Sequence, residues 1–186
     1  MSDYRRFRVE GATYFFTVVT DGRVPLLVEE QARVFLRLVY DRCRERWPFV
    51  TNAIVLLPDH LHAIWSLPPG DADYSRRWAW IKKEFTKLWL AEGNPERRVS
   101  VARARDGRRG VWQPRFWEHM IRDVDDFEKH ADYIHFNPVK HGYAKSPGNW
   151  EWTTFHTWVR DGHYPTDWGG TGVAERVDTL SDTIGE

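Results

Sequence analysis

The sequence predicts an α+β fold in which a ferredoxin-like (RRM-like) antiparallel sheet carries helices on one face. Short β-branched or aromatic runs alternate with longer segments that repeat apolar residues every three to four positions, in the order β-α-β-β-α-β-α. The length of 186 residues, of which 41% are hydrophobic and 15% aromatic, suffices for one domain with a single well-filled core.

The first half of the chain predicts three strands and one helix. Residues 12–20, ATYFFTVVT, are β-branched and aromatic, which indicates a buried strand. Residues 29–47 predict a helix with one apolar stripe. Residues 49–57 and 60–67 predict two more strands, which the tight turn at Pro58-Asp59 joins. Consecutive strands joined by so short a turn are expected to pair antiparallel.

The second half predicts two further helices and one strand. Residues 74–90 form an amphipathic helix, and residues 94–110, rich in Arg and Gly, are expected to be a basic mobile loop. Residues 115–122 predict the fourth strand. Residues 123–136 predict the last long helix, which should end at Asn137-Pro138 because a residue before proline disfavours the α conformation.

Composition limits the class of protein and its location. No run of about 18 apolar residues could cross a bilayer, and the N-terminus lacks the apolar segment of a secretory signal. The single cysteine, Cys43, excludes an internal disulfide and falls on an apolar helical stripe, where it predicts an inert core thiol. We therefore expect a cytoplasmic domain over residues 1–160 and an acidic, loosely ordered tail over residues 161–186.

The formal net charge of zero conceals a basic middle. Residues 76–109 carry eleven Lys or Arg against four acids, which suits either a solvated surface or a polyanionic partner. Lys and Arg bind phosphates, and Trp80 or Trp112 could stack on unpaired bases. The candidate nucleic-acid contacts are Arg76, Arg77, Trp80, Lys83, Lys87, Arg97, Arg98, Arg103, Arg105, Arg108 and Arg109.

Two histidines form a candidate metal site in LPDHLHAIW. Side chains alternate along a strand, so His60 and His62 share a face, with Cα atoms roughly 6.5–7 Å apart. Two imidazoles at that spacing can reach one cation, and neutral imidazole is a good metal ligand. A polar edge strand would give the same pattern, so the two residues alone leave the choice open.

A helical tyrosine in HADYIHFNPVKHGY is a candidate nucleophile. Tyr133 and Asn137 are one turn apart, away from the apolar stripe, so Tyr133 is expected to be presented rather than buried. A phenol is a poor nucleophile at neutral pH, and a metal that polarises the electrophile would remedy this. His130 or His135 could accept its proton. Six other tyrosines compete, and spacing does not choose among them.

Five segments, in a fixed order along the chain, indicate the family that the sequence resembles. PDHLH and YIHFNPVKHG lie about seventy residues apart, and GATYFFTVVT, DYSRRWAWIKKEFT and WQPRFWEHMIRD accompany them. Over roughly residues 4–160 the set resembles the REP-associated tyrosine transposases, relatives of the insertion-sequence-200-like transposases within the single-tyrosine HUH transposases. An HxH pair is weak by itself, whereas the ordered set is specific.

The resemblance implies an HUH endonuclease type of fold and a chemistry. His60 and His62 would bind Mg²⁺ or Mn²⁺, with Asn137 as a third ligand, and Tyr133 would attack a phosphodiester. Single-stranded DNA beside a palindromic REP-type hairpin would be cut through a 5′-phosphotyrosine, which a 3′ hydroxyl could later reseal without a nucleotide cofactor. The protein would act as a monomer or homodimer at the nucleoid.

Two other functions fit the same residues. The chain could be the transposase of a mobile insertion sequence, or a non-catalytic module that binds single-stranded nucleic acid on the same fold. A covalent protein–DNA adduct distinguishes an enzyme from a binding module.

Overall fold

One antiparallel sheet organises the chain, in the strand order β2-β3-β1-β4. The computed structural model describes residues 8–170, 172–174 and 177. The strands are β1 (Thr13–Val19), β2 (Val50–Leu56), β3 (His60–Ser66) and β4 (Trp117–Met120). Both central strands have antiparallel neighbours on each side. This order is that of a ferredoxin-like fold, so the predicted fold class is confirmed.

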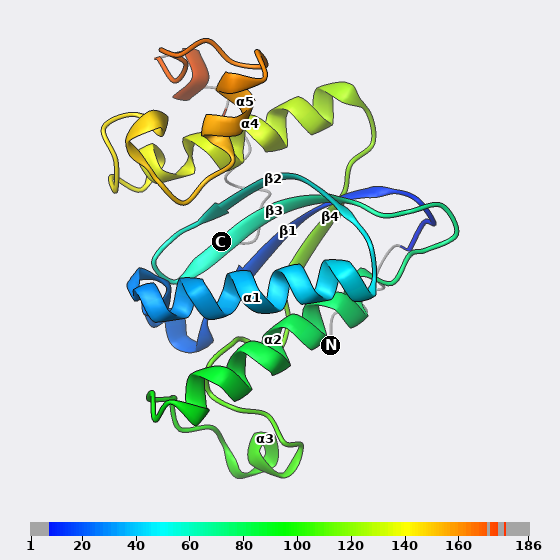
Figure 1. The fold of residues 1–186 in the computed structure, drawn as a ribbon, viewed down its shortest axis with the longest axis vertical. Helices are drawn as coiled ribbons and strands as arrows, with labels where there is room; N and C mark the ends of the chain where they lie inside the picture. The colour runs from blue at the N-terminus through cyan, green and yellow to red at the C-terminus, as the bar shows by residue number, and fades with distance from the viewer. Residues whose placement is uncertain (1–7, 171, 175–176, 178–186) are drawn as a thin grey trace.

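The helices form a layer on each side of the sheet (Figure 1). Helices α1 (Glu30–Arg46) and α2 (Tyr74–Ala91) cover one face, as the ferredoxin-like repeat requires. Helix α4 (Val124–Lys140) and the short α5 (Phe155–Arg160) lie on the other. The sequence predicts α4 as an addition to the repeat, and the structure places it against β2 and β3.

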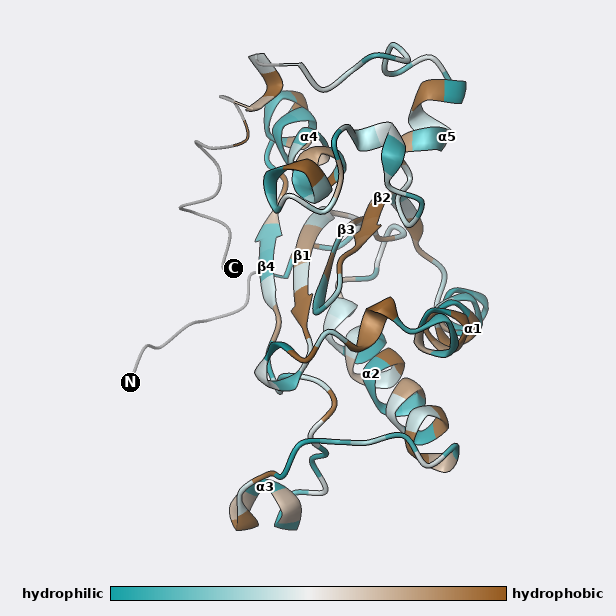
Figure 2. Ribbon diagram, turned by 90° about the vertical axis from the view of Figure 1, so that its left-hand side faces the viewer, coloured by the Kyte–Doolittle hydropathy of each residue, from teal (hydrophilic) through white to brown (hydrophobic). Residues whose placement is uncertain are grey.

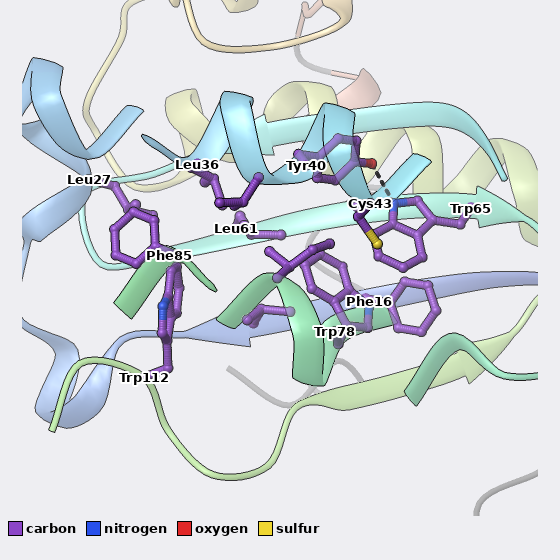
Figure 3. Close-up of a cluster of buried hydrophobic side chains, with 14 of the residues drawn as sticks. Phe16, Leu27, Leu36, Tyr40, Cys43, Leu61, Trp65, Trp78, Phe85 and Trp112 are labelled. Carbon is purple, nitrogen blue, oxygen red and sulfur yellow. Dashed lines mark hydrogen bonds between the residues drawn. The ribbon is translucent and has the colours of Figure 1, made fainter. Parts of the chain in front are cut away.

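Aromatic side chains dominate the core between the sheet and helices α1 and α2 (Figure 3). Trp65 of β3 stacks on Trp78 of α2, with ring centroids 4.1 Å apart. The indole N–H of Trp65 donates to the Tyr40 hydroxyl at 2.6 Å, which satisfies both buried polar groups. Cys43 is fully buried in this core, as its position on the apolar stripe of α1 predicts.

A second cluster of apolar side chains joins the other face of the sheet to α4. Phe15, Val55 and Ile64 project from the strands and pack in one cluster with Ala131 and Ile134 of the helix. In Figure 2 the sheet lies between α4 on one side and helices α1 and α2 on the other. Because side chains alternate along β3, the face that carries Ile64 also carries its two histidines.

Helix α4 runs one turn beyond the predicted end. Pro138 lies inside it and is buried, and the helix continues to Lys140. Gly142, at φ +72°, ends it: the amide of Gly142 donates to the Val139 carbonyl at 2.9 Å and that of Tyr143 to the Pro138 carbonyl at 2.8 Å. The predicted end at Asn137-Pro138 was wrong because tertiary packing retains the last turn. That turn keeps Lys140 on the same helix as Tyr133.

The Arg-rich segment at residues 94–110 contains one helical turn, α3 (Val101–Arg105), which lies apart from the sheet in Figure 2. Its two ends meet, since the amide of Arg97 donates to the Gly110 carbonyl at 3.0 Å.

Short 3₁₀ helices occur at Asp21–Arg23, Leu26–Val28 and Pro147–Asn149. Among the described residues, no helix is both long and apolar enough to cross a membrane.

Candidate active site

The two histidines of β3 lie together beneath α4. His60 and His62 are 1% and 0% exposed, and their ring centroids are 4.9 Å apart at an interplanar angle of 82°. Burial on a strand paired on both sides fixes the position of each ring. The two histidines therefore lie on one face of the sheet, as the alternation of side chains along a strand predicts.

Oxygen atoms engage the Nδ1 atom of each ring. The Nδ1–H of His60 donates to Asp59 Oδ1 at 2.6 Å, and Nδ1 of His62 is 3.0 Å from Thr17 Oγ1. Burial alone would raise the pKa of Asp59, but hydrogen bonds and charge from His60 and Arg23 hold it below its ordinary value. An ionised Asp59 only accepts, so Nδ1 of His60 carries the proton of this hydrogen bond, and Nε2 is the ring nitrogen that could bind a metal ion.

Tyr133 packs against His62. Their ring centroids are 5.3 Å apart at 76°, and Phe15 lies edge-to-face with the tyrosine at 6.1 Å. Tyr133 is 0% exposed, so the expectation of a presented side chain was wrong. The reason is the position of α4, which lies directly on the sheet and buries consecutive residues on several of its sides. Structure rather than spacing thus selects this tyrosine as the histidines' neighbour.

The last turns of α4 add polar groups beside Tyr133. Asn137 is fully buried one turn beyond it. Lys140 Nζ donates to the Tyr133 hydroxyl at 3.2 Å and lies 4.9 Å from the centre of its ring. His141 follows the helix, with its ring 5.6 Å from that of His60. Sequence reasoning missed Lys140 because it ended the helix at Asn137; the spacing of seven residues would have indicated it.

A His–Asp–His group lies where β4 meets the start of α4. Ligand atoms of His119, Asp126 and His130 lie within 4.8 Å of one another, so this group could hold a metal ion. His119 Nε2 is 2.8 Å from Asp126 Oδ2, and Arg122 donates to the same oxygen at 3.0 Å. Burial would raise the pKa of Asp126, but these partners hold it well below its ordinary value. The sequence indicated His130 as a candidate proton acceptor, whereas Asp126 was not among the predicted site residues.

The candidate proton acceptors on α4 make other contacts. Nδ1 of His130 lies 2.7 Å from the Asp126 carbonyl, and Nε2 of His135 lies 2.9 Å from Thr154 Oγ1. Burial lowers the pKa of both, that of His135 to about 3. His135 is therefore a neutral, hydrogen-bonded core residue at neutral pH rather than a partner of Tyr133.

A basic cavity of about 920 Å³ lies between α2 and residues 103–115. Helix α2 covers the face of the sheet opposite to α4 (Figure 1). Lys83 and Lys87, both exposed, face the cavity from α2. Its other basic lining residues are Lys82, Arg103, Arg108, Arg109 and Arg115. Arg76 is exposed on the same helix, and Trp80 is half-buried with its ring edge on Trp47, 6.0 Å away.

Two predicted nucleic-acid contacts are instead structural. Arg77 is fully buried, and its guanidinium donates to Asp71 at 2.7 and 3.1 Å and to the Pro48 carbonyl at 3.0 Å. Trp112 is also buried, with its ring 5.1 Å from Phe85. Arg77 was predicted from the basic run and Trp112 from its place after the Arg-rich segment. In the structure Arg77 bonds to residues just after α1 and just before α2, and Trp112 packs on Phe85 of α2.

Ion pairs hold several other arginines of residues 94–110. Asp21, itself buried, lies 3.1 Å from Arg103 and 3.8 Å from Arg97. Arg109 pairs with Glu96. Arg98 and Arg105 are exposed. The basic segment is therefore attached to the domain through some of its arginines, while others face solvent.

Known proteins resemble the chain over almost its whole length. The REP-associated tyrosine transposase of Escherichia coli K12 is 44% identical over 170 residues, covering 91% of this chain and 92% of that protein. A relative from Haemophilus influenzae that carries the same family name is 42% identical over 170 residues, covering 91% and 94%. No protein-family model matches the chain.

The fold agrees with this relationship. A solved structure of a REP-associated tyrosine transposase bound to a REP hairpin matches with a TM-score of 0.75 and 43% identity, covering 91% of this chain and 92% of that one. Identity of this size over nine-tenths of both chains, together with a shared fold, establishes common ancestry. The chain belongs to the REP-associated tyrosine transposases, a family of DNA-transposing enzymes.

Proposed function

We propose that this transposase cuts and rejoins single-stranded DNA beside a palindromic REP-type hairpin, through a 5′-phosphotyrosine on Tyr133. The observation that carries the proposal is the contact between Tyr133 and His62, whose ring centroids are 5.3 Å apart. This contact places the hydroxyl-bearing ring of Tyr133 beside two buried imidazoles whose orientations are fixed by their surroundings. The hairpin is the partner named for the similar solved structure, and its chemistry suits the basic surface described above.

His60, His62 and Asn137 would hold a divalent cation in this site. The donor set fits: hydrogen bonds at both Nδ1 atoms orient the rings, and a buried amide lies on the facing helix. Two imidazoles and an amide oxygen accept Mn²⁺ or Mg²⁺. Such an ion, when bound, polarises the scissile phosphate and stabilises its added charge. The His119 group fits less well, because Arg122 already occupies Asp126.

The reaction exchanges one phosphate ester for another. Tyr133 Oη forms a bond to phosphorus, and the bond from phosphorus to the 3′ oxygen breaks. The phenolic proton passes to solvent, and the departing 3′ oxygen takes a proton from solvent. Attack by a second 3′ hydroxyl reverses these events and releases Tyr133, so no nucleotide cofactor is required. Because Tyr133 is buried, side chains over it must move before a phosphate reaches Oη.

Exposed basic residues on the other side of the sheet would hold the hairpin backbone. We assign this role to Arg76, Lys83, Lys87, Arg98, Arg105 and Arg108, with Trp80 as a stacking platform. Arg97, Arg103 and Arg109 would contribute charge while keeping their ion pairs. Such contacts supply affinity that falls as salt rises. We place this activity in the cytoplasm at the nucleoid, by a monomer or a homodimer.

A covalent adduct tests the proposal. End-labelled hairpin DNA with single-stranded flanks is incubated with Mn²⁺ or Mg²⁺ and resolved on a denaturing gel. Wild type should form a shifted protein–DNA band, and Tyr133→Phe and the double variant His60→Ala/His62→Ala should not. Tyr143→Phe is the matched control, since Tyr143 lies ten residues away and is exposed; its adduct should persist.

The remaining outcomes separate the alternatives. An adduct that survives Tyr133→Phe and disappears in Tyr143→Phe would move the nucleophile to Tyr143. Tight, salt-sensitive hairpin binding without any adduct, across metals and substrates, would replace the enzyme with a binding module. An adduct that forms equally well in the presence of a chelator would remove the cation from the proposal and leave the tyrosine.

A further inference from the structure

We propose that Lys140 is a catalytic residue, whose ammonium group holds Tyr133 Oη and neutralises the negative charge that develops there during cleavage and rejoining. The inference rests on the proposed function, because it takes Tyr133 as the nucleophile. It adds a positive charge supplied by the protein itself, on the nucleophile's side of the phosphate.

The geometry places the ammonium group on the reacting atom. Lys140 Nζ is 3.2 Å from Tyr133 Oη, within hydrogen-bond distance, and 4.9 Å from the centre of the ring. The two residues are seven positions apart on one continuous helix, which is almost two full turns, so both lie on one side of α4. The turn beyond Pro138, closed by Gly142, is what brings Lys140 to this position.

The surroundings make that contact specific. His62 and Phe15 lie edge-to-face with the Tyr133 ring, and the ring is fully buried. A cation near the ring and hydroxyl of a buried tyrosine acts in a medium of lower effective dielectric than water, where charge–charge interactions are stronger. A preorganised ammonium group directed at an oxygen that gains charge in the transition state stabilises that state more than the ground state.

The chemistry needs no further reagent. Lys140 stays protonated throughout. In cleavage it donates a hydrogen bond to Oη while the Oη–P bond forms, the P–O3′ bond breaks, and solvent exchanges the two protons. In rejoining the Oη–P bond breaks, and the ammonium group stabilises the departing phenolate oxygen. Because rejoining is the reverse of cleavage at phosphorus, stabilisation of Oη in the shared transition state would accelerate both directions.

Single-turnover rates test the assignment. Lys140→Met should reduce both adduct formation and rejoining by about 10²–10³-fold, the size expected for one lost charge-stabilising donor. Lys140→Arg, which keeps the charge, should recover most of the rate. Hairpin affinity should not change. Lys129→Met is the matched control on the same helix, since Lys129 is exposed and paired with Asp125 at 3.2 Å; its rates should match wild type.

Two further measurements keep the result interpretable. Lys140→Gln retains a hydrogen-bond donor without charge, so if Lys140→Met fails to fold, the comparison of Gln with Arg decides. A substrate with sulfur in place of the bridging 3′ oxygen has a better leaving group. The defect of the uncharged variant should persist on it, because Lys140 acts at Oη.

Each contrary result has one meaning. Uncharged variants that cleave within about threefold of wild type, with the Tyr133-dependent adduct intact, overturn the role of Lys140 and leave the proposed function standing. Full rescue by the sulfur substrate also overturns it, because the charge would then act on the leaving group. Absence of any Tyr133 adduct in wild type overturns the proposed function and this inference together.

Discussion

Asp59 Oδ1 accepts a 2.6 Å hydrogen bond from Nδ1 of His60, its neighbour in sequence. The turn at Pro58-Asp59 thereby orients an imidazole at the start of β3. We expect Asp59→Asn to weaken Mn²⁺ binding by about 10–100-fold, the usual effect of removing a carboxylate that orients a metal-binding histidine. Isothermal titration with Mn²⁺ measures this. Adduct formation should recover at saturating Mn²⁺; a variant with unchanged Mn²⁺ affinity would contradict the role of Asp59.

Substitution of Arg77 tests whether this residue stabilises the fold or contacts DNA. It is buried and bonded to Asp71, so Arg77→Met leaves that carboxylate without its guanidinium and should cost about 3 kcal/mol of unfolding free energy. Urea unfolding measures the loss. The neighbouring Arg76→Met, at an exposed position, should be nearly neutral in stability. Weakened hairpin binding by folded Arg77→Met, without loss of stability, would return Arg77 to the interface.

The sequence predicts the sheet and its helices well, since their patterns are local. Alternation along β3 places His60 and His62 on one face, and the observed register confirms this. What spacing alone misses is tertiary. The burial of Tyr133 depends on α4 lying on the sheet, and that of Arg77 on how α1 packs against α2.

Helix length shows the same limit. Pro138 is a local signal to stop, yet the last turn persists, because residues around it are buried and Gly142 provides a cap. The contact between Lys140 and Tyr133 follows only once that turn is present. The ion pairs of Asp21 with Arg97 and Arg103 join segments about eighty residues apart, and no local pattern predicts such pairs.

Salt dependence tests the basic surface on α2. Lys83 and Lys87 are exposed and line the basic cavity, so the double variant Lys83→Gln/Lys87→Gln should weaken hairpin binding at low salt. The slope of log affinity against log salt should fall by about 0.7–0.9 for each phosphate contact removed. Lys129→Gln, on α4, should leave both unchanged. Equal effects at Lys129 and on α2 would indicate general charge attraction instead of a defined surface.

Cys43 should be inert in the folded protein. Burial raises the pKa of its thiol to about 11, so almost no thiolate is present at pH 8. Its side chain is fully buried beside the Arg77 carbonyl, 4.0 Å from Sγ. We expect a thiol reagent at pH 8 to react only as fast as the protein unfolds, and rapidly in denaturant. Fast labelling under native conditions, with Cys43→Ser as the blank, would contradict a core thiol.

His135 makes stability depend on pH below neutrality. Burial lowers its pKa from 6.5 to about 3, so it stays neutral in the folded protein over that interval, while the unfolded chain takes up a proton below pH 6.5. The unfolded state binds more protons there, so the free energy of unfolding falls as pH decreases, with a slope from this group that approaches about 1.4 kcal/mol per pH unit well below pH 6.5. Urea unfolding at several pH values between 5 and 7 measures the slope.

A substitution isolates the contribution of His135. His135→Gln keeps a polar side chain near Thr154, 2.9 Å from Nε2 in wild type, but does not titrate. The slope of its unfolding free energy against pH should therefore be smaller by the contribution of one proton. A residual slope should remain, because burial also lowers the pKa of His130. His163→Gln, at an exposed position, should retain the full wild-type slope. If His135→Gln and wild type lose stability in parallel from pH 7 to 5, the acid sensitivity arises elsewhere, because a group with equal proton uptake in both states contributes no slope.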